Sequence, residues 1–400
     1  MYLTFDPRSL SRRVAAAGAA CLLLASCDTK DNPAFVQPTV ACDGNGGATI
    51  NGNAVAIAPG GYFTAGNKIY SAASCQPVRF YGVSRPSLSF NATGDRLGDS
   101  VTTEHDFAAI RSWKANMVRI ELASYYWVPT AGSYSASYAG RVERVVRQAR
   151  RAGLNVILAL QASDRGVASF VPSGNTHQPM PDRNHAIPFW TDVANRFKND
   201  GGVMYELFSE PFPVGGRGGF SNWGMWKNGG LHPADNVYEP RPAFQAVGMQ
   251  ELYNLVRGTG AHNLVIIGGT KWGYYLDGVP KNRVNGYNLV YATHPWDFPG
   301  ANQPGDWQKD WAFLAKTDPV MVTEFGQFDC GDDYVRALLD KADELGLSWT
   351  AWMWSAPRPG ESTAQNGPDD VVCERSYLVM DWTGTPSKTG QTIKNRLATY

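Results

Sequence analysis

The sequence has no excess of charge of either sign, because 36 Lys and Arg residues balance 36 Asp and Glu residues. Nucleic-acid-binding domains usually carry a basic patch, and disordered tails usually carry a high net charge. The composition therefore points to neither class. No GxGxxG or GxxxxGK[ST] pattern follows any of the apolar runs, so a nucleotide-binding function has no support.

Cysteine is also scarce, and its spacing excludes the common zinc sites. The sequence has six cysteines, with no CxxC pair and no close Cys/His cluster. Two of the six lie in the first 27 residues, and the other four allow three disulfide pairings. In an oxidising compartment we expect Cys42 to pair with Cys75 and Cys330 with Cys373, because each pair joins positions close in sequence.

The apolar run near the N-terminus, residues 14–25, is too short to cross a bilayer as a helix. It follows a basic start and precedes small residues, as in a secretory signal peptide, which we place at residues 1–26. The run ends in "LASC", which resembles the lipobox of bacterial lipoproteins and implies a lipid on Cys27. Residues 27–48 then form a polar tether. We expect export to the bacterial cell envelope, with this lipid as the only membrane attachment, or secretion if the signal is cut elsewhere.

Aromatic residues, by contrast, are abundant at 12% of the chain. Such a composition suits an uncharged, flat ligand such as a sugar chain, although most aromatic side chains in any protein belong to its core. With balanced charge, this favours a carbohydrate over a nucleic acid as the partner.

Short apolar runs alternate with helical stretches along most of the chain. Most of the runs are apolar on both faces, as buried parallel strands are, and they lie at 79–83, 117–122, 155–160, 203–208, 263–269, 289–294, 320–326 and 348–354. Eight strands alternating with helices favour a (β/α)8 barrel or a doubly wound sheet. Because nucleotide motifs are missing and the length suffices for a barrel, we predict an α/β fold, a (β/α)8 TIM barrel over residues 49–400. A small N-terminal β-hairpin cap would cover residues 49–75, and one helix would span residues 244–260.

Polar residues gather at the expected C-terminal strand ends, where such barrels place their active sites. They are Arg119 on the second strand, Gln161 after the third, Ser209 and Glu210 after the fourth, His294 and Trp296 at the sixth, and Glu324 on the seventh. Strands four and seven face each other across the barrel, so we expect both glutamates in one cleft. Two carboxylates across a cleft can hydrolyse a glycosidic bond, one as acid and one as nucleophile or base. The acid needs a raised pKa, whereas Arg119 would lower the pKa of the nucleophile.

Several of these stretches carry a resemblance to a known family. "YELFSEPF", "THPWD", "VTEFG" and "SWTAWMW" resemble the motifs of strands four, six, seven and eight in glycoside hydrolase family 5, the cellulase-type clan of retaining glycosidases. "FYGVSRPSL" and "NMVRIEL" resemble its first two strands, and the resemblance extends over residues 78–400. It implies that Glu210 is the acid/base and Glu324 the nucleophile. It also implies that Arg119 and His294 support the nucleophile and the sugar, and that Trp352 stacks on the sugar.

Three positions depart from the family pattern in the cleavage subsite. Ser209 stands where the family usually has Asn, Gln161 where it has His, and Trp296 where it has Tyr. These departures bear on the substrate and on efficiency. The Gly-rich segment after Glu210 is expected to form a long rim loop, in which Trp223 and Trp226 either bind further sugar units or pack on the barrel.

The leading hypothesis is therefore a monomeric, cofactor-free and metal-free retaining hydrolase of a β-1,4-linked polysaccharide, either glucan or mannan. Two alternatives remain open. One is a non-catalytic envelope lipoprotein that binds glycans, and the other is a variant exo-acting glycosidase on short glycosides.

Overall fold

The computed structural model describes residues 35–94, 104–164, 177–237, 240–298 and 300–400. The predicted signal peptide, Cys27 and the start of the tether lie outside these residues. The chain divides into two compact units, Met1–Val36 and Gln37–Tyr400, and the barrel belongs to the second. Within the described residues, no helix combines the length and the apolar character needed to span a membrane.

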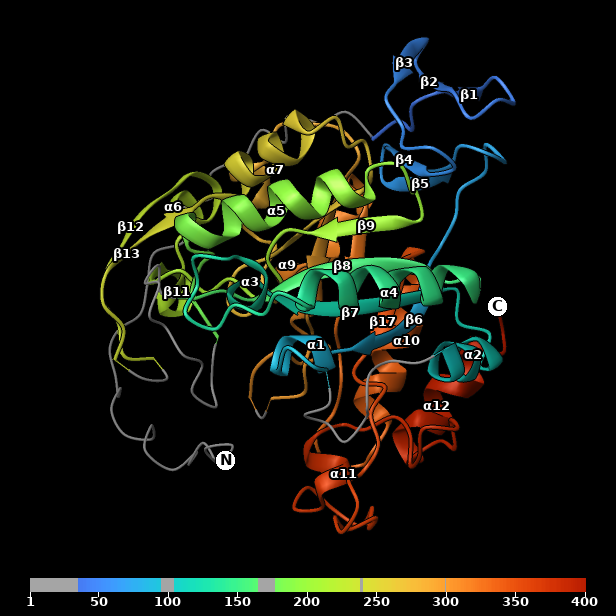
Figure 1. Cartoon of the computed structure of the whole chain (residues 1–400). Helices are drawn as coiled ribbons and strands as arrows, with labels where there is room; N and C mark the ends of the chain where they lie inside the picture. Colours follow the sequence, from blue (N-terminus) through green and yellow to red (C-terminus); the bar gives the residue numbers. More distant parts are fainter. Residues whose placement is uncertain (1–34, 95–103, 165–176, 238–239, 299) are drawn as a thin grey trace, which may run out of the picture. The chain divides into compact units, whose positions relative to one another are not determined.

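Eight parallel strands close into a barrel in the order β14-β15-β16-β17-β6-β7-β8-β9 (Figure 1). Their bounds are β6 (Tyr81–Arg85), β7 (Met117–Ala123), β8 (Asn155–Ala162), β9 (Val203–Glu206), β14 (Val265–Gly268), β15 (Leu289–Thr293), β16 (Val320–Val322) and β17 (Ser348–Ala351). Nearly every residue of these strands is buried, which is why their sequences are apolar on both faces. The (β/α)8 TIM barrel and its eight strands are confirmed.

Helices follow most of the strands and pack around the barrel (Figure 1). The longer ones are α2 (Glu104–Ser112), α4 (Tyr138–Arg151), α5 (Arg183–Phe197), α7 (Met249–Gly258), α10 (Asp333–Leu345) and α12 (Lys388–Leu397). Short helices are α1 (Ser87–Phe90), α3 (Ser124–Trp127), α8 (Val279–Asn282), α9 (Trp307–Asp310) with the 3-10 turn η3 (Ala312–Lys316), and α11 (Val371–Glu374). Asp182 caps α5 by accepting from the backbone N–H groups of Asn184 and His185. Only the four-residue α8 lies between β14 and β15, matching the sequence, which has no clear helix there.

The N-terminal cap consists of two small antiparallel sheets rather than one hairpin. One contains β1 (Val40–Cys42), β2 (Ala48–Ile50) and β3 (Asn53–Val55), and the other pairs β4 (Tyr62–Ala65) with β5 (Lys68–Ser71). The cap thus begins earlier than predicted, inside the segment expected to be a tether, because β1 pairs with β2. Cys42 and Cys75 are joined across it, with Cα atoms 5.8 Å apart. Cys330 and Cys373 form the second disulfide, with Cα atoms 4.6 Å apart.

The cap contacts the barrel at the N-terminal ends of the strands. The Tyr62 hydroxyl donates to Asn155, the first residue of β8, at 3.1 Å. The backbone N–H of Thr64 donates to Asn288, directly before β15, at 3.3 Å. The cap therefore covers the barrel end opposite the expected active site.

The Gly-rich segment after β9 is more ordered than the predicted rim loop. It contains β10 (Gly215–Gly216), η2 (Arg217–Gly219), β11 (Phe220–Ser221), α6 (Trp223–Asn228) and β12 (Gly229–His232), which pairs with β13 (Phe244–Val247). The helix predicted over 244–260 starts only at Met249, because the residues before Gly248 belong to this ribbon. Trp226 is buried and donates to the carbonyl of Gly268 at 2.9 Å, so it packs on the barrel and offers no sugar platform.

Candidate active site

Glu210 and Glu324 meet at the C-terminal end of the barrel. Glu210 follows β9 and Glu324 follows β16, and 8% and 4% of their surfaces are exposed. A carboxylate oxygen of each lies within 4.8 Å of the other and of a ring nitrogen of His294. The two glutamates that the sequence places in one cleft are thus brought together.

Arg119, on β7, is fully buried and contacts most of the polar residues of the site. A guanidinium has five N–H donors, and the acceptors around them come from several strands. Nε donates to Glu206 at 2.6 Å, Nη1 to Glu324 at 3.1 Å and to Glu121, and Nη2 to Gln161 at 3.3 Å and to Ser209. Two of the sequence departures, Gln161 and Ser209, therefore share one nitrogen of Arg119.

Both carboxylate oxygens of Glu324 accept a hydrogen bond. The indole N–H of Trp296 donates to Oε1 at 3.2 Å, and Arg119 donates to Oε2. The Trp296 ring stacks on Phe328, with centroids 4.8 Å apart and planes 15° apart. Trp296 thus supplies an N–H donor to Glu324 from a ring fixed by stacking.

Both carboxylate oxygens of Glu210 are engaged as well. Oε1 lies 3.1 Å from Nδ1 of His294, whose Nε2 lies 2.9 Å from the hydroxyl of Thr323. Oε2 accepts from Gln161 at 3.3 Å and lies 3.1 Å from Nε2 of His177. His294 therefore contacts Glu210 more closely than Glu324, from which it is 3.8 Å away.

Three charged or titratable residues of the site were not singled out in the sequence. Glu121 follows Arg119 by two residues, and Glu206 precedes Glu210 by four, spacings that place strand side chains on one face and could have identified both. His177 lies between β8 and α5, outside any strand pattern. The site thus has four carboxylates around one arginine.

The tryptophans divide between the site and the core. Trp352 is half-buried after β17, with its ring 6.2 Å from that of Trp296 in an edge-on arrangement. Trp223 is also half-buried, but its ring lies 5.0 Å from that of Trp226 and against Gly278. These contacts favour the packing interpretation of Trp223.

The electrostatics of the site reverse the order expected for the two glutamates. Burial, and next the nearby Glu210 charge, raise the pKa of Glu324 to about 7. Burial would also raise the pKa of Glu210, but His177, His294 and Arg119 together lower it. One reason is that His177 and His294 lie beside Glu210. The other is that Glu324 shares Arg119 with Glu121 and Glu206. Burial opposes ionisation of Glu206, yet Arg119 lowers its pKa to about 2.

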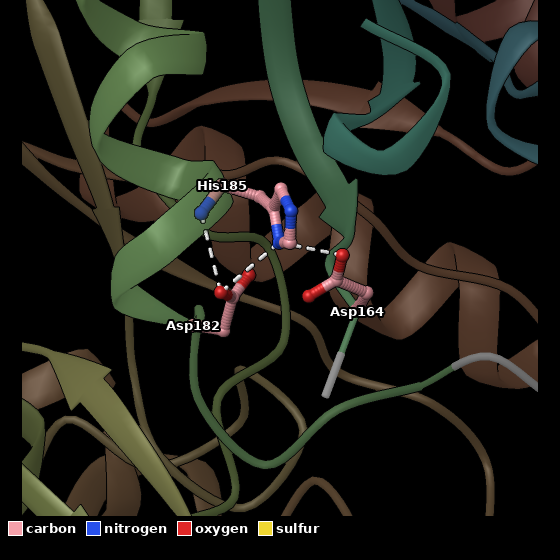
Figure 2. Close-up of side chains that lie close together, drawn as sticks. All are labelled: Asp164, Asp182 and His185. Carbon is pink, nitrogen blue, oxygen red and sulfur yellow. Dashed lines mark hydrogen bonds and ion pairs between the residues drawn. The ribbon is translucent and has the colours of Figure 1, made fainter. Parts of the chain in front are cut away.

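Among the residues that the structure describes, two groups of side chains lie close enough to hold a metal ion. In both groups, the histidine nitrogens or carboxylates already contact one another or neighbouring side chains. In Asp164, Asp182 and His185, Nδ1 of the histidine lies 2.6 Å from Asp164 and 3.2 Å from Asp182 (Figure 2). Burial opposes the charged imidazole, but the two aspartates raise the pKa of His185 to about 10. Because Nδ1 of His185 already faces both carboxylates, we interpret this group as a buried ion pair. In Glu210, His294 and Glu324, both histidine nitrogens already face protein oxygens.

Comparison with known proteins places this site in a family. The model of the family described as Cellulase (glycosyl hydrolase family 5) matches residues 71–357. The chain is 24% identical over 233 residues to Endoglucanase Z of Dickeya dadantii (strain 3937), covering 57% of this chain and 43% of that protein. It is 24% identical over 292 residues to Endoglucanase MaCel5A of Microbulbifer sp. (strain ALW1), covering 70% and 48%. The chain thus spans about half the length of these relatives.

Solved structures share the same fold. The beta-glucanase SdGluc5_26A from Saccharophagus degradans superposes with a TM-score of 0.62 at 20% identity, covering 85% of this chain and 94% of that one. The endocellulase from Pyrococcus horikoshii gives a TM-score of 0.61 at 18% identity, covering 85% and 99%. The family match extends over most of the barrel and includes Arg119, Glu210, His294 and Glu324. The chain belongs to glycosyl hydrolase family 5, the cellulase family.

Proposed function

We propose that this protein is a retaining endo-β-glycanase that hydrolyses a β-1,4-linked polysaccharide, with Glu210 as acid/base and Glu324 as nucleophile. The observation that carries the proposal is the approach of their carboxylate oxygens to within 4.8 Å at the C-terminal end of a family 5 barrel. Retaining enzymes hold their two carboxyl groups about 5–5.5 Å apart, whereas inverting enzymes leave about 6.5–9.5 Å for a water molecule.

In the first step of this reaction, a carboxylate oxygen of Glu324 attacks the anomeric carbon while Glu210 protonates the departing glycosidic oxygen. In the second step, Glu210 takes a proton from water, and the resulting oxygen nucleophile releases the sugar from Glu324. Hydrogen bonds from Trp296 and Arg119 orient the Glu324 carboxylate. Trp352, half-buried beside Trp296, offers a face on which the sugar stacks.

The substrate we favour is a β-1,4-glucan of the cellulose type. Both curated relatives described above are endoglucanases. The Saccharophagus beta-glucanase has also been solved in complex with cellotetraose, with a TM-score of 0.61 and 21% identity to this chain. A β-mannan is the competing substrate, because nothing in the site geometry separates the two sugars.

The test combines a substrate panel with two variants. Reducing ends should be released from a soluble cellulose derivative faster than from mannan, and Glu210→Ala and Glu324→Ala should each remove most turnover. With an activated leaving group, Glu210→Ala should accumulate a glycosyl-enzyme, and azide should rescue it with net retention. Rescue with inversion would reverse the two roles, and release from aryl glycosides alone would favour an enzyme of short glycosides.

We also propose that the protein is exported and carries lipid on Cys27. The proposal is supported by the "LASC" sequence behind a short apolar segment that follows three arginines. The attached lipid would be its only membrane contact.

A further inference from the structure

The acid/base candidate Glu210 has no free carboxylate oxygen in the structure. Oε1 faces His294, and Oε2 faces Gln161 and His177. A general acid must come within hydrogen-bond distance of the atom it protonates. Each carboxylate oxygen has two lone pairs, and Oε2 already faces two groups. One contact of Oε2 must therefore give way if this oxygen is to deliver the proton to the glycosidic oxygen of a substrate.

The partners of the two oxygens differ in how firmly they are held. The His294 side chain is fully buried, and its second nitrogen is fixed by Thr323 at 2.9 Å and lies 3.5 Å from Glu206. The His177 side chain is 31% exposed and lies beside Gln161 at 3.1 Å. Of the groups around Glu210, His177 is the one that can leave without opening the core of the barrel.

We propose that His177 is a positioning residue that holds Oε2 of Glu210 in the free enzyme and is displaced from it by the leaving-group sugar. Oε2 is then the oxygen that delivers the proton. This inference rests on the proposed role of Glu210 as acid/base.

The displacement would restore the pKa order that catalysis needs, because it removes His177 from the free site. His177 comes first among the groups that lower the pKa of Glu210, against the opposing effect of burial. When His177 moves away, burial favours a neutral Glu210 carboxyl. The proton shared by the pair then passes from the Glu324 carboxyl to the Glu210 carboxylate, which leaves Glu324 ionised for attack. No bond to the sugar changes in this step, and the charge of the pair is conserved.

Other charged groups also face Glu210, and the test must separate their effect on its titration from that of His177. Arg119 approaches from β7, His294 from β15, and Glu324 from β16. Glu121 and Glu206 lie behind Arg119. All of these side chains are buried, and His177→Gln replaces none of them.

The experiment compares His177→Gln, which removes the imidazole, with the matched control His262→Gln. His262 contacts Tyr287 at 2.7 Å and precedes β14, at the other end of the barrel. Carboxyl titration of the free protein is followed by 13C NMR of glutamate side chains, with Glu210→Gln used for assignment. We expect His177→Gln to raise the Glu210 midpoint by about one pH unit, the scale of a charge lost at close contact, and His262→Gln to leave it unchanged. His177→Ala should behave like His177→Gln.

Kinetics on a soluble cellulose derivative test the displacement itself. The pH profile of kcat/KM reports the free enzyme and that of kcat reports the substrate complex. In the free enzyme Glu210 has the lower pKa of the pair. His177→Gln should therefore move the acidic limb of kcat/KM upward by about the same unit, while the acidic limb of kcat stays in place. An unchanged Glu210 midpoint would overturn the proposal. So would an equal shift of the acidic limb in the kcat/KM profile and in the kcat profile.

The titration needs no turnover, which separates this proposal from the proposed function. If no glycan is hydrolysed, the proposed function fails, and saturating cellotetraose replaces the kinetics. A Glu210 midpoint that rises with cellotetraose in the wild type, but not in His177→Gln, supports displacement. Equal midpoints with and without cellotetraose refute it.

Discussion

Replacing Glu206 by Gln should destabilise the barrel by several kcal/mol at neutral pH. Glu206 is fully buried, accepts from Nε of Arg119 at 2.6 Å and from Thr323 at 2.9 Å, and has its pKa lowered from 4.5 to about 2. That depression corresponds to about 3 kcal/mol of folding free energy. Substitutions that remove one partner of a buried ion pair cost about 3–5 kcal/mol. The cost expected from the pKa shift therefore agrees with the cost expected from such substitutions.

The pH dependence tests the reasoning independently. Because the folded pKa of Glu206 lies below its usual value, its stabilisation is complete above pH 4.5 and is lost as pH falls through about 2. The cost of Glu206→Gln, measured by urea unfolding followed through tryptophan fluorescence, should therefore be about 2 kcal/mol smaller at pH 3 than at pH 7. Glu251→Gln removes the partner of the exposed Arg183 and should cost less than about 1 kcal/mol. A Glu206→Gln cost as small as this control, or one independent of pH, would refute the account.

Trp296→Phe keeps the stacking ring but removes the N–H that bonds Glu324. Since a hydrogen bond to a charged group contributes about 1.5–3 kcal/mol, kcat/KM on a soluble cellulose derivative should fall about 10- to 100-fold, and a change below twofold would contradict the role of this bond. Ser209→Asn should lower kcat, because Ser209 is fully buried with its hydroxyl on Arg119 and the longer side chain must displace its neighbours; a clear rise in kcat on cellulose-type substrate would contradict this. Mass spectrometry of the mature N-terminus should find an acylated Cys27, whereas an unmodified N-terminus elsewhere would reject the anchor.

The sequence predicts the barrel well because its strands are short, apolar on both faces and separated by amphipathic helices. It predicts Glu210 and Glu324 because both stand at strand ends, where barrel topology brings distant residues together. The prediction of a helix over residues 244–247 is wrong. An apolar run that precedes a helix can either extend that helix or form a strand, and here it forms a strand because β12 pairs with it.

The electrostatic design of the site is not readable from strand positions. Arg119 looked like a partner for one nucleophile, but Glu121 and Glu206 also accept from it. How one charge is divided among three carboxylates depends on atomic distances and burial. The position of His177 could not be predicted, because it lies in a connecting segment whose sequence has no periodic pattern.

All five N–H groups of Arg119 have acceptors, and this has a consequence for laboratory evolution of this protein. Gln161 and Ser209 accept from the same nitrogen of Arg119, so a change at one alters the partner available to the other. Neighbours that share a partner are the pairs whose substitutions fail to add. A library that varies one position at a time would test each substitution beside the wild-type residue at the other position. It would therefore reject substitutions that are favourable only in combination. Varying positions 161 and 209 together is the shorter route to a new substrate preference.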